Sequence, residues 1–313
     1  MPSWGDILEQ IRQGTDEIGA ESYDVVRKHY LNKVAQETDS DAILYASSWT
    51  VPSNSQEDVS LSDADVQGFM EALSGRRSDT LSLILHSPGG KPEAAEHIVE
   101  YLRSMYDEID VYVPHAARSA ATLMCCSADS VVMGKHSSLG PIDPQFTIRT
   151  GLGVRMVPAD SIIDQFDKAR EEFAESGTVG AWGPMLQQYG PSLIKECEDA
   201  KDYSKNLAKK WSKEYMFEGS NASQQASELS EALIEREEHK SHSRPIMRDE
   251  AEEMGFNVKK LEENQDLQDA VLSTYHAASH TFSGTSAIKI IESHNQSSYV
   301  VMSDDNESDD DDE

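Results

Sequence analysis

The chain has 313 residues, of which 38% are hydrophobic and 27% charged, a composition typical of a folded protein in water. Its 57 acidic residues outnumber 27 basic ones, and the formal net charge of −30 repels nucleic acids and anionic membranes, so we expect no nucleic-acid partner. The sequence shows no signal-peptide pattern at its start and no apolar run near the ~20 residues that span a bilayer. We therefore expect no membrane anchor and a cytoplasmic location.

Residues 1–38 are predicted to form an N-terminal amphipathic helical segment, because Ile7, Ile11 and Ile18 recur on one face. Residues 39–160 follow as a predicted α/β core, in which short apolar runs indicate strands and amphipathic runs indicate helices. The predicted strands are 42–46, 81–85, 111–113 and 131–133, the helices are 62–73, 93–105 and 119–128, and the loops are 47–62 and 134–145. This alternation favours a mostly parallel sheet with crossover helices.

Residues 161–300 are predicted to be a helical extension that packs on the core or on a neighbouring subunit. Within it, helical periodicity dominates 161–217, a polar helix covers 222–239, and two short helices lie in 244–277. The last segment, 301–313, is predicted to be a disordered acidic tail, because eight of the eleven residues from 303 to 313 are acidic and cannot form a core.

Three cysteines, Cys125, Cys126 and Cys197, are present, and their spacing matches neither a disulfide framework nor a CxxC metal site. The adjacent pair lies in an apolar stretch, which is typical of packed core thiols. We expect no metal and no cofactor.

Two stretches carry residues suited to acyl-transfer chemistry. Ser119 follows a strand and a short turn and opens a helix of small residues, where free backbone N–H groups can stabilise a developing anion. About thirty residues earlier, a buried strand closes in the turn 86–90, whose consecutive Gly89 and Gly90 can point an amide at a ligand oxygen. Taken separately, each pattern also fits an ordinary element: a serine N-cap and a strand-to-helix turn.

Together these stretches resemble a known family. The pattern consists of 86–90, 113–116, Ser119-Ala120, Ala128-Asp129, Gly134, 139–145, 182–184 and 188–191. It is similar to the serine dehydrogenase proteinases, which are relatives of signal peptide peptidase A and have the ClpP/crotonase fold. The resemblance covers roughly residues 40–260 and implies an α/β fold of this type. It also implies that Ser119 is the nucleophile, that the amides of Gly90 and Ala120 form the oxyanion hole, and that Pro88 and Gly89 contact substrate.

The sequence offers several candidates for the general base. ClpP places a histidine about two dozen residues after its serine, and none stands there in this chain. The signal-peptide-peptidase branch uses a lysine about fifty residues on, where this chain has Lys168. His136, in the loop after the next strand, has a suitable intrinsic pKa, and His239 or His242 is a third option. Asp143 either orients the base or caps a turn.

The resemblance implies a serine endopeptidase that hydrolyses peptide bonds through an acyl-enzyme and assembles as a homo-oligomer, with a peptide or protein as substrate. Two alternatives remain. The first is a catalytically inactive scaffold or adaptor with the same fold, because the base is unclear. The second is an acyl-CoA enzyme of the crotonase type, which the acidic charge disfavours because coenzyme A carries phosphates.

Overall fold

A twisted seven-stranded sheet forms the centre of the computed structural model, which describes residues 3–51, 56–151, 153–177, 180, 182–187, 189–190, 192–235 and 241–303. The strand order is β10-β5-β3-β2-β1-β11-β12. The strands are β1 (Asp41–Ser47), β2 (Thr80–His86), β3 (Glu108–Val113), β5 (Ser130–Met133), β10 (Val258–Lys260), β11 (Ala287–Ser293) and β12 (Ser298–Met302). The first five pair in parallel, and β11 and β12 extend the sheet antiparallel. The predicted α/β class with a mostly parallel sheet is confirmed.

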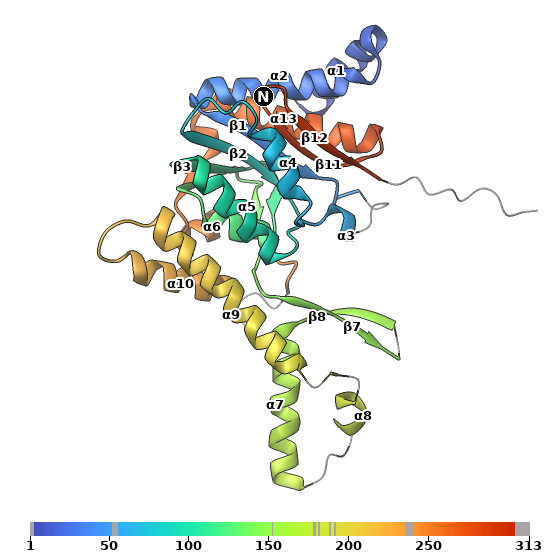
Figure 1. Cartoon of the computed structure of the whole chain (residues 1–313), viewed down its shortest axis with the longest axis vertical. Helices are drawn as coiled ribbons and strands as arrows, with labels where there is room; N and C mark the ends of the chain where they lie inside the picture. Colours follow the sequence, from blue (N-terminus) through green and yellow to red (C-terminus); the bar gives the residue numbers. More distant parts are fainter. Residues whose placement is uncertain are drawn as a thin grey trace, which may run out of the picture.

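Helices cover both faces of this sheet, which explains why its strands are apolar on both sides. In β1, Ile43 and Tyr45 face one layer while Leu44 and Ala46 face the other, as strand alternation requires. The first layer holds α4 (Asp65–Ala72), α5 (Pro92–Met105), α6 (Ala120–Cys126), α9 (Leu193–Trp211) and α10 (Ala222–Ile234). The opposite layer holds α2 (Glu21–Thr38) and α13 (Gln265–Gly284), as Figure 1 shows.

The N-terminal segment consists of two helices that pack on α13. Ser3 caps α1 (Trp4–Ile18), and its reciprocal hydrogen bonds with Asp6 form a capping box. Ile7 and Ile11 are buried against α2 and α13, whereas Ile18 is 45% exposed and does not join their apolar face. The described helices include none long and apolar enough to cross a bilayer.

The predicted helical extension over 161–300 is wrong in part, because β10, β11 and β12 belong to the central sheet. The predicted pair of short helices in 244–277 is also wrong: α12 (Arg248–Glu253) is short, but α13 has 20 residues. β11 was not predicted from the sequence, because Lys289 and Glu292 interrupt its apolar run, although both side chains are buried. Each has a buried partner of opposite charge, which permits its burial.

A projecting arm extends away from the sheet (Figure 1). We define it as the hairpin of β7 (Gln145–Thr150) and β8 (Gly153–Pro158), followed by α7 (Ala159–Ser176) and α8 (Trp182–Leu186). A small apolar cluster that includes Ile148, Ile162 and Cys197 joins the hairpin to α7 and α9. The predicted core boundary at residue 160 therefore cuts the arm, because the hairpin packs with the helices that follow it.

Short elements complete the described chain. They are α3 (Gln56–Val59), β4 (Ala116–Ala117), β6 (Ser138–Leu139), a π-helical turn (Ser212–Met216), β9 (Ile246–Met247) and a 3-10 turn (Leu261–Glu263). β4, β6 and β9 form a three-stranded sheet of their own. The predicted tail over 301–313 begins inside β12, and residues 304–313 lie outside the described residues.

A fully buried ion pair fastens α2 to β11. The Arg27 guanidinium donates to both oxygens of Glu292, at 2.6 and 3.0 Å, and to the hydroxyl of Thr281 at 2.9 Å. Both charged side chains have no solvent exposure. A paired buried charge is tolerated, but an unpaired one is costly.

We expect Glu292→Gln to lower the free energy of unfolding by up to about 3–5 kcal/mol, because Arg27 would lose its buried counterion and keep only the half-exposed Asp24, at 2.7 Å. Glu100→Gln is the matched control, since it breaks the half-exposed pair with Lys210 and should change stability little. Urea unfolding monitored by circular dichroism measures both variants. Equal losses in the two variants would contradict the role given to the buried pair.

Candidate active site

Ser119 lies where the chain leaves β3 and enters α6. Its φ of +49° is in a region that non-glycine residues avoid, at a cost of about 1–3 kcal/mol. Its side chain makes no capping hydrogen bond to α6, unlike an ordinary N-cap serine. A strained backbone together with a hydroxyl that does not cap the helix favours a chemical role for Ser119 over a structural one.

The glycine turn after β2 packs directly on the Ser119 loop. The Ser87 N–H donates to the carbonyl of Ala116 at 3.1 Å, and the Arg118 N–H donates to the carbonyl of Ser87 at 3.0 Å. Gly89 has φ +89°, and a Cβ there would lie 2.3 Å from the Arg118 carbonyl and 2.7 Å from the Ser119 Cβ. Only glycine permits this approach, which holds the turn against the start of α6.

Two backbone amides near Ser119 are free to donate. The Gly89 N–H donates to the Ser87 hydroxyl. At the bridge between Leu61 and Gly90, the Leu61 N–H donates to the Gly89 carbonyl and the Lys91 N–H donates to the Leu61 carbonyl, so the Gly90 N–H takes no part. Among the described residues, neither the Gly90 N–H nor the Ala120 N–H, at the first turn of α6, has an acceptor. These are the two amides that the family resemblance names as the oxyanion hole.

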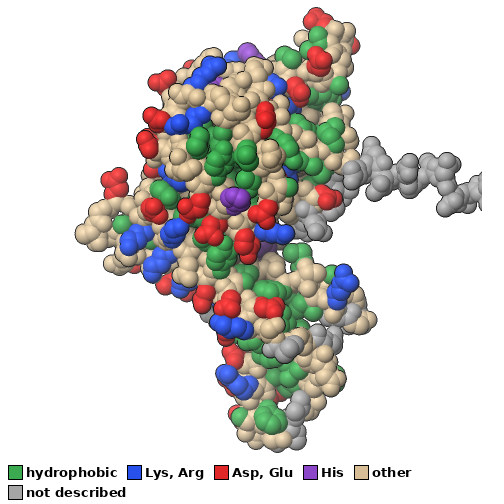
Figure 2. Space-filling model, in the orientation of Figure 1, with side chains coloured by type: hydrophobic (Ala, Val, Ile, Leu, Met, Phe, Trp, Pro, Cys, Tyr) green, Lys and Arg blue, Asp and Glu red, His purple; other side chains and the backbone are tan. Residues whose placement is uncertain are grey.

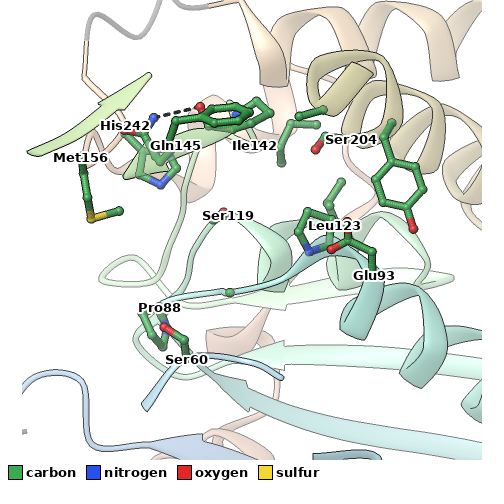
Figure 3. A pocket seen from close by; sticks show the side chains of 16 residues that line it. Ser60, Pro88, Glu93, Ser119, Leu123, Ile142, Gln145, Met156, Ser204 and His242 are labelled. Atoms are coloured by element: carbon green, nitrogen blue, oxygen red, sulfur yellow. Dashed lines mark hydrogen bonds between the residues drawn. The ribbon is translucent and has the colours of Figure 1, made fainter. Parts of the chain in front are cut away.

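Ser119 opens into a cavity of about 280 Å³. Its lining includes Pro88, Gly90, Ser119, Leu123, Ile142 and His242 (Figure 3). The structure thus brings together Ser119 and Gly90, with Ala120 directly behind Ser119. Gly89, predicted to contact substrate, lies beneath this surface and does not line the cavity.

His242 and Asp143 form a hydrogen-bonded pair at this cavity. The Nδ1 of His242 lies 2.7 Å from an oxygen of Asp143, whose side chain is 6% exposed. The other Asp143 oxygen accepts from Gln145 at 2.8 Å. Since a carboxylate only accepts, the proton sits on Nδ1 and leaves Nε2 as an acceptor. This is the histidine tautomer that a general base for a serine requires.

The segment that carries His242 is held next to the nucleophile by two contacts. β9 pairs antiparallel with β6, two residues against two. The guanidinium of Arg118, the neighbour of Ser119, donates to the Leu139 carbonyl at 2.8 Å and to the Arg244 carbonyl at 3.1 Å. Burial lowers the pKa of Arg118, which reflects how far this guanidinium is removed from water. One side chain therefore links the nucleophile loop to the histidine segment.

A family model described as a ClpP-like SDH-type serine proteinase matches residues 70–267, more than half of the chain. The chain belongs to this family. The matched region contains the glycine turn, Ser119, Asp143 and His242, so the whole site described above lies inside it. The ClpP-like fold predicted from sequence resemblance is confirmed.

Two relatives of this chain come from Methanocaldococcus jannaschii, and both are described as uncharacterized proteins. MJ0137 is 31% identical over 196 residues, which are 62% of this chain and 59% of the relative. MJ1495 is 29% identical over 119 residues, which are 38% of this chain and 36% of the relative. The chain thus spans less than two thirds of the length of these relatives.

Among solved structures, the 1510-N membrane-bound stomatin-specific protease matches with a TM-score of 0.27 and 17% identity. The match covers 46% of this chain and 72% of the other chain. A similarity this low supports no conclusion about the residues of the site.

The other residues predicted as candidate bases lie elsewhere. Lys168 is exposed on α7 in the projecting arm and does not line the cavity. His136 places its Nε2 2.9 Å from the carbonyl of Pro114 and is also outside the cavity lining. His239 lies outside the described residues. Sequence reasoning kept His242 only as a third option, because its partner Asp143 is 99 positions away and only the fold pairs them.

No group of three or more metal-ligating side chains is found within the described ranges. Instead, four aromatic rings pack behind the two site loops. They belong to Trp49, His86, His115 and Tyr275, with the His86 ring centroid 5.3 Å from that of His115 and 4.9 Å from that of Tyr275. His86 ends β2 and His115 follows β3, so the stack sits at the root of both loops. Burial lowers the pKa of His86 to about 3, and a nearby His115 adds to this shift.

We expect the free energy of unfolding to fall as the pH drops from about 6.5 towards 3. In this window His86 is protonated in the unfolded chain but neutral in the folded one, so the unfolded state binds more protons and acid favours it. His86→Phe keeps a ring and removes the titration, and should flatten the slope by up to about 1.4 kcal/mol per pH unit.

The control for this prediction is His97→Gln, because His97 is exposed on α5 and should leave the slope unchanged. Urea unfolding at a series of pH values measures the three proteins. A slope in His86→Phe equal to that of the unmodified chain would contradict the assignment.

Proposed function

We propose that this chain is a serine peptidase in which Ser119 is the nucleophile, His242 the general base and Asp143 its orienting partner. The observation that carries the proposal is the His242–Asp143 hydrogen bond at the cavity that also contains Ser119. Family membership supports proteinase chemistry at a coarser level. The three side chains supply the roles that acyl transfer by a serine requires.

In the first half of the reaction, the Ser119 Oγ attacks the peptide carbonyl while its proton passes to His242 Nε2. The tetrahedral oxyanion accepts hydrogen bonds from the Gly90 and Ala120 amides, which lack other acceptors among the described residues. His242 then gives the proton to the leaving amine, the C–N bond breaks, and an ester to Ser119 remains. Water hydrolyses this ester with the same base and releases the free enzyme.

The Ser119 hydroxyl makes no hydrogen bond within the described part of the chain. This fits a site without substrate, because hydrogen bonds between nucleophile and base often form only in the substrate complex. It also motivates the alternative, an inactive scaffold that keeps the fold. Assembly into a homo-oligomer is part of the proposal and does not alter these roles.

We expect a fluorophosphonate probe to label the purified chain at Ser119, because the probe forms an ester only with an activated serine. Ser119→Ala should abolish labelling. His242→Ala should slow it about 10²-fold or more, since the proton acceptor is lost. Mass spectrometry of the labelled peptide and the rate of labelling provide the two measurements.

Three further variants sharpen this test. His97→Ala removes an exposed histidine on α5 and should label at the unmodified rate. Lys168→Ala and His136→Ala separate the competing bases, because loss of labelling in either one with full labelling in His242→Ala would overturn the base assignment. Complete absence of labelling in the folded unmodified chain would favour the alternative, a catalytically inactive scaffold.

We expect Asp143→Asn to slow peptide hydrolysis about 10²-fold or more while the fold is kept. An asparagine amide at this position can donate to His242 Nδ1, which places the proton on Nε2 and blocks its role as acceptor. The rate of fluorophosphonate labelling at Ser119 provides a second readout, because labelling needs the same proton acceptor and should slow in parallel. Unchanged rates of hydrolysis and labelling would remove Asp143 from the mechanism.

A further inference from the structure

The cavity beside Ser119 has a mixed lining, in which apolar side chains and an acidic residue lie together. Leu123 on α6, Ile142, and Ala200 on α9 supply part of its apolar surface, and serines such as Ser60 and Ser204 supply polar surface. Glu93, the second residue of α5, lines the same cavity. Figure 3 shows Glu93 and Leu123 together on the side of Ser119 away from His242. A substrate side chain in this part of the cavity would lie between an apolar surface and an acidic residue.

The Glu93 carboxylate has no cationic partner in the part of the chain that the structure describes. Lys210 is paired with Glu100, which lies seven positions after Glu93 on α5. Glu96 accepts a hydrogen bond from the Tyr203 hydroxyl. Glu93 is exposed, and Figure 2 shows acidic side chains gathered over α5.

The position of Glu93 relative to the oxyanion amides defines which substrate residue it meets. α5 begins directly after the glycine turn, so only three positions separate Glu93 from Gly90. A substrate residue whose carbonyl is held by the Gly90 amide would therefore lie close to the start of α5, since Gly90 and Glu93 line one cavity. The cavity of about 280 Å³ is at the small end of ligand pockets, which suits one side chain.

We propose that this chain cleaves after lysine or arginine, with Glu93 as the residue that selects the positive charge. This inference rests on the proposed peptidase function. The long methylene stem of lysine or arginine would pack on Leu123 and Ile142, and its charged end would reach the Glu93 carboxylate. A neutral side chain of similar length fills the same apolar walls but gains no ion pair.

Fluorogenic peptides that differ only at the residue before the cleaved bond test this proposal. The pairs are lysine against methionine, and arginine against its neutral analogue citrulline. We expect kcat/KM to favour the charged member by up to about fivefold, which is the upper range for an exposed ion pair. Glu93→Gln should remove this preference while methionine peptides are still cleaved, and Glu93→Lys should reverse it towards glutamate.

The matched control is Glu71→Gln, which makes the same change of net charge on the exposed surface of α4. It should keep the preference, and this separates Glu93 from the general attraction of a chain with charge −30 for basic peptides. A preference for methionine over lysine, or a lysine preference that Glu93→Gln leaves intact, would overturn the inference. Failure of the peptidase proposal is distinguishable, because then no peptide is cleaved and Ser119 is not labelled.

Discussion

The site depends on the close approach of Gly89 to the backbone of Arg118 and Ser119. Two loops that follow neighbouring parallel strands touch here with no side chain between them, because a Cβ at Gly89 would lie 2.3 Å from the Arg118 carbonyl. The backbone hydrogen bonds of Ser87 to Ala116 and Arg118 fix this contact on both sides. The Gly90 amide, the Ala120 amide and the Ser119 hydroxyl meet only because this contact exists.

Such a contact has an energetic cost that the rest of the fold must offset. Ser119 adopts a strained φ, and the His86 imidazole is buried without charge at the root of the loops, beside the half-buried His115. The surrounding sheet is buried on both faces by helices, which supplies apolar contact on either side of β2 and β3. A rigid support of this kind allows unfavourable local conformations to persist at a functional site.

The parts of the site that are formed by residues close together in the sequence could be predicted from the sequence. A serine at the start of a small-residue helix and a glycine pair after a buried strand can be read directly, and parallel strands bring their ends to one edge. The His242–Asp143 pair could not be read in this way, since it depends on a two-residue strand pairing between β6 and β9. β11 was missed for another reason: Lys289 and Glu292 look exposed in sequence, and only their partners Asp65 and Arg27 explain their burial.

Arg118 makes the local and the long-range parts of the site interdependent. Its backbone belongs to the loop that Gly89 contacts, and its guanidinium holds the carbonyls of Leu139 and Arg244. Gly140 leaves room for this side chain, because a Cβ there would lie 2.8 Å from the Arg118 Cδ. Arg118 is half-buried, so a shift of the nucleophile loop would take its guanidinium away from these acceptors and disturb the His242 segment. The proposed nucleophile and base are thereby positioned by one residue, although they are more than 120 positions apart in the chain.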